Sequence, residues 1–165
     1  MEFQRQISRK LHEEHEATLG LLERFESALT RLRTVPPPAD DATWPYLLAQ
    51  LDTALQYEVS RHFGLEEDQL FPRLHENGEG ELAELLFEEH ESIRQVVGPL
   101  LPLIAAARTN ALDAAGWRSL KTSGFELTER LGSHARKEEG SLVPFVDEML
   151  DEDTDNALWE EYSSG

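Results

Sequence analysis

The stretch His-Phe-Gly-Leu-Glu-Glu-Asp-Gln-Leu-Phe-Pro at residues 62–72 recurs in outline as His-Ala-Arg-Lys-Glu-Glu-Gly-Ser-Leu-Val-Pro at residues 134–144. Both copies follow the pattern His-x-x-x-Glu-Glu-x-x-Leu-x-Pro, and a copy of Glu-Glu-His-Glu precedes each of them, at 13–16 and at 88–91. The corresponding histidines are spaced alike, 75 residues apart in the shorter pattern and 72 in the longer one. The sequence therefore predicts an internal duplication, in which each half contributes two histidines and one glutamate.

These residue types indicate a metal site. Histidine and carboxylate are the ligands that a protein without cysteine uses for transition metals. In the longer pattern the histidine and the first glutamate are four residues apart, so they lie on one face of a helix, one turn apart. The imidazole can then bind one metal ion while the carboxylate spans that ion and its neighbour. Two such half-sites predict one site for two metal ions, with candidate ligands His15, His62, Glu66, His90, His134 and Glu138.

Hydrophobic periodicity predicts an all-α protein with four long helices and no strand. The second helix, for example, is expected to bury a stripe formed by Leu48, Leu51, Leu55 and Val59. Gly98-Pro99 and Pro102 are expected to kink or end the third helix. The predicted helices cover about 3–33, 44–75, 81–97 and 112–150. Short connections between long amphipathic helices favour an up-down-up-down four-helix bundle, built here from a duplicated helix pair.

Helical phase predicts that the candidate ligands point into this bundle. At about 100° per residue, each of the four histidines and both glutamates fall on the apolar arc of their own helix. His15, for example, falls near Leu11 and Leu22. A buried glutamate without a partner costs several kcal/mol, so two of them in one core need a compensating cation. A pair of divalent metal ions meets that need.

For four other titratable residues near the two patterns, helical phase allows two alternative roles each. Glu67 and Glu139 are turned about 100° away from the bridging positions, so they are solvated or hydrogen-bonded to a ligand. His12 lies at the edge of the stripe, as a surplus ligand or a surface residue. Glu58 also lies at the edge of its core arc, with a polar contact or a metal role open to it.

Composition limits the class of function. The chain has 165 residues and no cysteine, which excludes disulfides, iron–sulfur clusters and thiolate zinc sites, and we expect a cytoplasmic protein. Its 15 basic and 33 acidic residues give a formal charge of −18, which disfavours nucleic acid and anionic membranes as partners. We expect a bundle domain at residues 1–150 and an acidic C-terminal tail at 151–165 that is solvated and frayed.

Four ordered stretches together resemble the hemerythrin-like, HHE cation-binding family of non-haem di-iron four-helix bundles, over about residues 5–150. They are Leu-His-Glu-Glu-His-Glu (11–16), Phe-Glu-Glu-His-Glu (87–91) and the two long stretches at 62–72 and 134–144. The resemblance implies two iron ions with an oxo or hydroxo bridge. The implied ligands are the same six residues, with Glu66 and Glu138 bridging.

The chain departs from the oxygen carriers of that family in two places. The carriers have a further histidine one turn before the third-helix ligand, where this chain has Leu86. The fourth-helix bridging carboxylate also follows its histidine at a shorter spacing here. These departures favour the bacterial-type relatives, which the resemblance associates with oxygen, nitric oxide, peroxide or iron handling.

Two functions therefore remain open. In one, the di-iron protein binds and reacts with dioxygen, hydrogen peroxide or nitric oxide in oxidative or nitrosative stress or iron handling, with peroxidase-, catalase- or oxidase-like activity. In the other, it is a non-catalytic sensor or binder of oxygen, nitric oxide or iron. Small molecules are the expected partners in both.

Overall fold

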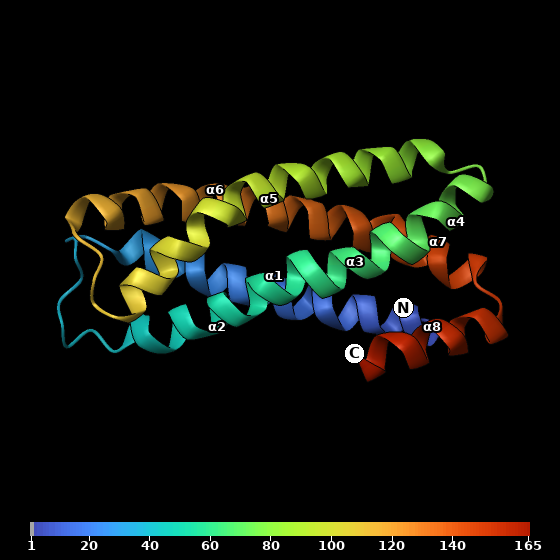
Figure 1. The fold of residues 1–165 in the computed structure, drawn as a ribbon, viewed down its shortest axis with the longest axis horizontal. Coiled ribbons are helices and arrows are strands. Elements are labelled where there is room, and N and C mark those ends of the chain that lie inside the picture. The colour runs from blue at the N-terminus through green and yellow to red at the C-terminus, as the bar shows by residue number, and fades with distance from the viewer. Residues whose placement is uncertain (1) are drawn as a thin grey trace.

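The computed structural model describes residues 2–165, and within these residues the chain is helical and has no strand (Figure 1). Two short segments are π-helices, labelled η. The elements are α1 (Gln6–Arg31), α2 (Thr43–Tyr57), η1 (Glu58–His62), α3 (Phe63–Leu65), η2 (Glu66–Leu70), α4 (Phe71–Glu76), α5 (Gly80–Arg108), α6 (Ala114–Gly140), α7 (Leu142–Met149) and α8 (Glu152–Ser164).

The long helices pack side by side as a bundle. The segments from α2 to α4 follow one another without interruption and form one helical rod, and α6 and α7 together form another, divided at Ser141. α1 contacts α2 and α6, and α5 contacts the α2–α4 rod and α6, so the four rods enclose one shared interior. Figure 1 shows successive rods running in opposite directions along the long axis. The internal duplication remains a prediction from the sequence.

The π-helical turns keep the ligand face of the second rod pointing inward. Buried positions there recur every four residues, at Glu58, His62, Glu66, Leu70 and Leu74. In a regular α-helix such a spacing drifts by about 40° at each step. The wider π turns at η1 and η2 offset this drift, and such turns are common at functional sites. They also explain a wrong prediction: the buried residue at this level is Glu58, while its neighbour Val59 is only partly buried.

The third helix extends further than the sequence predicts. α5 continues through Pro99 and Pro102 to Arg108, well beyond the expected end near Val97. Figure 1 shows α5 bending toward α2 in its yellow part, C-terminal to the prolines. Proline removes one backbone donor and clashes with the preceding turn, which bends a helix when tertiary packing holds both halves. Here Leu100 and Ile104 are fully buried beyond Pro99 and supply that packing.

Two apolar clusters lie along the bundle, with the polar candidate ligands between them. The first includes Leu21, Phe25, Leu51, Phe63, Ile93 and Leu131. The second includes Ile7, Leu11, Leu70, Leu86, Leu142 and Val146. In α1, His15 lies between Leu11 of the second cluster and Leu21 of the first, and the histidines of α5 and α6 are flanked in the same way. Burying a leucine side chain contributes roughly 1.5–3 kcal/mol to the free energy of folding. The apolar clusters on both sides therefore hold the candidate ligands in place along the bundle.

The C-terminal residues form a docked helix, so the expected frayed tail is wrong. α8 buries Leu158 and Tyr162 against the second cluster. Its Asp155 accepts hydrogen bonds from the backbone N–H groups of Gln6 and Ile7, at 2.9 and 3.0 Å. The first turn of α1 has no capping side chain of its own, and a helix start leaves N–H groups unpaired. α8 therefore supplies the cap for the helix that carries His15.

Among the residues that the structure describes, no helix combines the length and apolar character needed to cross a bilayer.

Candidate metal centre

All six predicted ligands lie together in the interior of the bundle. Each is at most 2% exposed. They come from all four rods, in which α1 and α5 supply one histidine each, and the other two rods supply one histidine and one glutamate each. The residues are His15, His62, Glu66, His90, His134 and Glu138.

The six residues form two adjacent groups that share both glutamates. Each group has two histidines and two carboxylates, and its potential ligand atoms lie within 4.8 Å of one another. The first group is His15, His62, Glu66 and Glu138, and the second is His90, His134, Glu66 and Glu138. The arrangement is that of a binuclear cation site.

Each shared carboxylate gives one oxygen to each group. Glu66 Oε1 lies 2.9 Å from His62 Nε2, and Glu66 Oε2 lies 3.0 Å from His90 Nε2. Glu138 Oε2 lies 2.9 Å from His15 Nε2, and Glu138 Oε1 lies 2.7 Å from His134 Nε2. All four imidazoles thus direct Nε2 toward the centre.

Unpaired polar atoms at this point fit a pair of metal ions. Among the described residues, eight buried side-chain atoms have no hydrogen-bond partner of acceptable geometry, and six of these belong to the centre. They are both carboxylate oxygens of Glu66 and Glu138, and Nε2 of His90 and His134. Buried polar atoms are rarely left unpaired unless another group binds them. The donors are nitrogen and oxygen atoms, and transition metals accept this combination.

The charges of the side chains are consistent with this role. Burial lowers the pKa of His15, but the carboxylates that face it, first Glu138 and then Glu139, outweigh burial and raise the pKa to about 9. For His90 and His134, burial again lowers the pKa and the neighbouring carboxylates raise it by more. The resulting pKa is about 9 for His90 and about 10 for His134. The pKa of His62 is also well above its usual value. Protons on these imidazoles therefore balance the carboxylates in the metal-free protein.

A second layer of carboxylates orients the four histidines. Each imidazole directs Nδ1 to a glutamate outside the centre, and such contacts fix the ring orientation of metal-binding histidines. The pairs are His15 with Glu139 at 2.7 Å, His62 with Glu14 at 3.3 Å, His90 with Glu67 at 2.9 Å and His134 with Glu89 at 2.8 Å.

Helical phase predicts only half of this layer of carboxylates. Glu67 and Glu139 could be solvated or hydrogen-bonded to a ligand by phase, and in the structure both contact a ligand histidine. Phase does not predict a role for Glu14 and Glu89, although each directly precedes a histidine in one of the two copies of Glu-Glu-His-Glu. Their partners lie on other rods, so a helix-phase argument within one element does not find them.

Glu58 is buried beside the first group. Its side chain accepts a hydrogen bond from Thr18 at 3.3 Å, and its Oε1 lies 3.9 Å from His62 Nε2. Burial raises the pKa of this carboxyl. Glu58 lies one turn before His62, and the corresponding position before His134 is Arg130. The guanidinium of Arg130 donates hydrogen bonds to the carbonyl and hydroxyl of Ser92. The first group therefore has an extra buried carboxylate that the second group lacks.

His12 and Leu86 each lie one turn before a candidate ligand, and neither belongs to the metal centre. His12 has a side chain that is 40% exposed, and its Nδ1 lies 2.7 Å from Glu139 rather than in the centre. It thus contacts the carboxylate that orients His15. Leu86, where an oxygen carrier has a histidine, is fully buried in the second apolar cluster.

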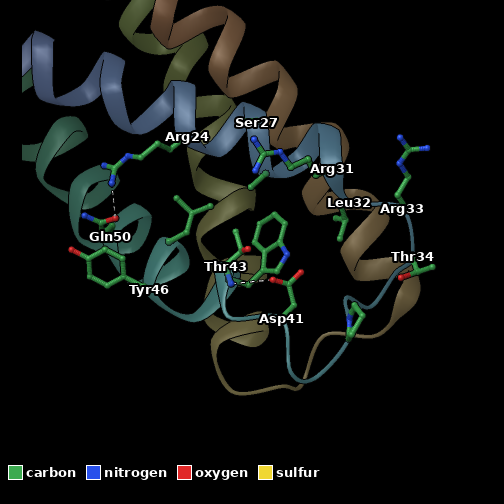
Figure 2. A pocket seen from close by; sticks show the side chains of 14 residues that line it. Arg24, Ser27, Arg31, Leu32, Arg33, Thr34, Asp41, Thr43, Tyr46 and Gln50 are labelled. Atoms are coloured by element: carbon green, nitrogen blue, oxygen red, sulfur yellow. Dashed lines mark hydrogen bonds between the residues drawn. The ribbon is translucent and has the colours of Figure 1, made fainter.

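A cavity of about 590 Å³ lies near the loop that joins α1 to α2 (Figure 2). The C-terminal half of α1, the loop after it and the start of α2 line it, and none of the six candidate ligands does. Figure 2 shows Arg24 and Tyr46 among the side chains that line it. This cavity is separate from the metal centre.

Comparison with known proteins agrees with the geometry. A model of the family described as "Hemerythrin HHE cation binding domain" matches residues 6–154. No curated protein matches the chain significantly. Because the family match spans all four rods that supply the centre, the chain belongs to the hemerythrin HHE cation-binding family.

Proposed function

We propose that the chain is a non-haem di-iron protein that binds and reacts with dioxygen, hydrogen peroxide or nitric oxide, and that reduction of hydrogen peroxide is its main reaction. The observation that carries this proposal is the number of donors in each group. Each group offers two imidazole nitrogens and one oxygen from each of two carboxylates. Sites of histidine and carboxylate with open coordination positions are typical of iron proteins that handle oxygen.

In this proposal, Glu66 and Glu138 would bridge the two ions, and the four histidines would be the terminal ligands. Bound iron would supply the position at which the small molecule binds and would pass electrons to it from an external reductant. The four outer carboxylates hold the imidazoles with Nε2 inward, so the centre is arranged before any substrate arrives. The fully buried leucines on both sides exclude bulk water.

Glu58 is the proton-handling residue in this scheme. Because burial raises the pKa of its carboxyl, Glu58 holds a proton at a higher pH than an exposed glutamate does. It also lines a groove between α1 and α2, of about 600 Å³, so its carboxyl group stands between that groove and His62. Reduction of peroxide to water consumes protons, and Glu58 Oε1 is placed to deliver one beside His62.

The test is metal content together with peroxide turnover. Iron-loaded protein should contain two ions per chain, show the charge-transfer bands of a bridged di-ferric centre, and consume hydrogen peroxide. His15→Ala should lose bound metal and turnover, whereas His12→Ala, one turn away on the same helix, should keep both ions. A reproducible single ion with full activity would overturn the di-iron model. Reversible oxygen binding without peroxide turnover would favour the alternative, a non-catalytic sensor.

A further inference from the structure

One of the four outer carboxylates has a different partner from the other three. A second basic side chain contacts each of the carboxylates of Glu67, Glu89 and Glu139. These partners are the guanidinium of Arg94 at 2.5 Å from Glu67, the ammonium of Lys137 beside Glu89, and the imidazole of His12 at 2.7 Å from Glu139. Glu14, which orients His62, has no second basic partner among the described residues and accepts a hydrogen bond from a tyrosine instead.

Two tyrosines continue this contact away from the centre. The hydroxyl of Tyr162 donates to Glu14 Oε1 at 2.6 Å, and the hydroxyl of Tyr57 donates to that of Tyr162 at 2.8 Å. Together with the contact between His62 and Glu14, this makes an unbroken hydrogen-bonded path from a candidate ligand to Tyr57. Tyr57 is 37% exposed, so the path ends at the surface.

The C-terminal helix holds this path in place. Tyr162 belongs to α8 and is 8% exposed. The guanidinium of Arg61 lies 5.2 Å from the centre of its ring and also donates to its backbone carbonyl. Burial and the hydrogen bond with Glu14 raise the pKa of the Tyr162 hydroxyl, so it is a neutral phenol at physiological pH. Such a phenol loses a proton together with an electron when it is oxidised.

The outer end of the path faces a groove suited to a small apolar molecule. Tyr57 lines the cavity of about 600 Å³ between α1 and α2. Ala17, Leu21 and Ala54 contribute apolar surface there, and Glu14 and Glu58 place carboxyl groups at the inner end. Arg24 also lines the groove, but the two carboxyl groups and the chain's net charge of −18 outweigh its single positive charge and disfavour an anionic reductant. A neutral phenol or hydroquinone fits this combination.

We propose that Tyr162 and Tyr57 relay single electrons to the metal centre from a small phenolic reductant bound in this groove. The inference rests on the proposed reduction of hydrogen peroxide, which supplies the oxidant. Tyr162 gives one electron to the centre and its hydroxyl proton to the Glu14 carboxylate. Glu14 then passes this proton to the peroxide oxygens, so that each electron delivered is accompanied by one proton. Tyr57 then restores Tyr162 by giving it a hydrogen atom, and the phenol restores Tyr57 in the same way. Two phenols and one hydrogen peroxide yield two phenoxyl radicals and two water molecules.

The decisive experiment uses iron-loaded protein in the di-ferric state, so that the iron itself holds no spare electrons for peroxide. The protein is mixed with hydrogen peroxide without a reductant and frozen for electron paramagnetic resonance. The chain has three tyrosines, so single substitutions assign the signal. A tyrosyl radical should form in the unmodified protein and be lost in Tyr162→Phe. In Tyr57→Phe the radical should remain on Tyr162, while oxidation of added hydroquinone is lost. Tyr46→Phe is the matched control, because Tyr46 is 68% exposed at the distant cavity and should leave both readouts unchanged.

A second measurement needs no variant and so does not depend on how a substitution folds. After peroxide treatment without reductant, peptide mass spectrometry should find oxidised Tyr57 and Tyr162 and unmodified Tyr46. Peroxide consumption without a tyrosyl radical, or with equal radical yield in Tyr162→Phe, would overturn the relay and leave the proposed function standing. Failure to consume peroxide at all would overturn both.

Discussion

Binding of two metal ions should release about four protons from the centre at pH 7, one from each histidine that becomes a ligand. A group with a pKa of about 9, as for His15 and His90, is about 99% protonated at pH 7. His134, with a pKa of about 10, is more fully protonated still, and the pKa of His62 is raised in the same direction. A metal ion binds neutral imidazole, so all four protons must leave as the site fills.

The release is measurable by anaerobic titration of metal-free protein with Fe²⁺. Calorimetry in two buffers of different ionisation enthalpy gives the number of protons per chain, and a pH indicator in weak buffer checks it. The apparent affinity should also rise with pH, by about two log units per pH unit for each ion, because each ion displaces about two protons.

Two variants test whether the released protons come from the ligand histidines. His134→Ala lacks one ligand and should release about one proton fewer. His75→Ala should match the unmodified protein, because His75 is exposed on α4 and belongs to neither group. Release of fewer than about two protons at full occupancy would refute the assignment of four charged histidines to the metal-free centre.

Three further predictions concern stability and reactivity. Metal at 100 times its dissociation constant should stabilise the fold by about 2.7 kcal/mol, so chelation should lower the melting temperature. His62→Ala and His134→Ala should abolish this difference while His12→Ala keeps it, and equal loss in all three would contradict the ligand assignment. In metal-free protein, histidines with raised pKa values stabilise the fold fully below about pH 6.5 and lose this effect as the pH rises through about 9, so thermal melts should show falling stability over that window. Finally, Leu86→His should slow air oxidation of the di-ferrous protein in stopped-flow spectra, and an unchanged rate would show that position 86 does not reach the centre.

Local pattern was sufficient to find the centre. A spacing of four residues places His62 and Glu66, or His134 and Glu138, on one helix face regardless of the rest of the fold. The apolar neighbours of each ligand then determine which way that face points, because the hydrophobic stripe must be buried. For this reason the six candidate ligands could be predicted before the packing of the rods was known, and the structure places all six in the interior.

Packing outweighs local preference in two places. The prolines at 99 and 102 predict a kink or an end in the third helix, and α5 bends there but continues to Arg108, because buried residues beyond the prolines hold it in place. Acidic composition predicts a frayed tail, yet α8 docks because Asp155 finds unpaired N–H groups on α1 and Leu158 finds an apolar cluster. A composition average does not reveal such partners, which are about 150 residues away along the chain.

The sequence by itself determined which side chains meet at the centre, since helix period and ligand spacing are properties of single elements. Only the tertiary structure decided what surrounds them: which outer glutamate faces which histidine, which of these glutamates a cation neutralises, and that Tyr162 reaches Glu14. Each of these contacts joins two elements far apart in sequence. Its existence depends on the relative rotation and depth of packed helices, which no single-helix pattern specifies.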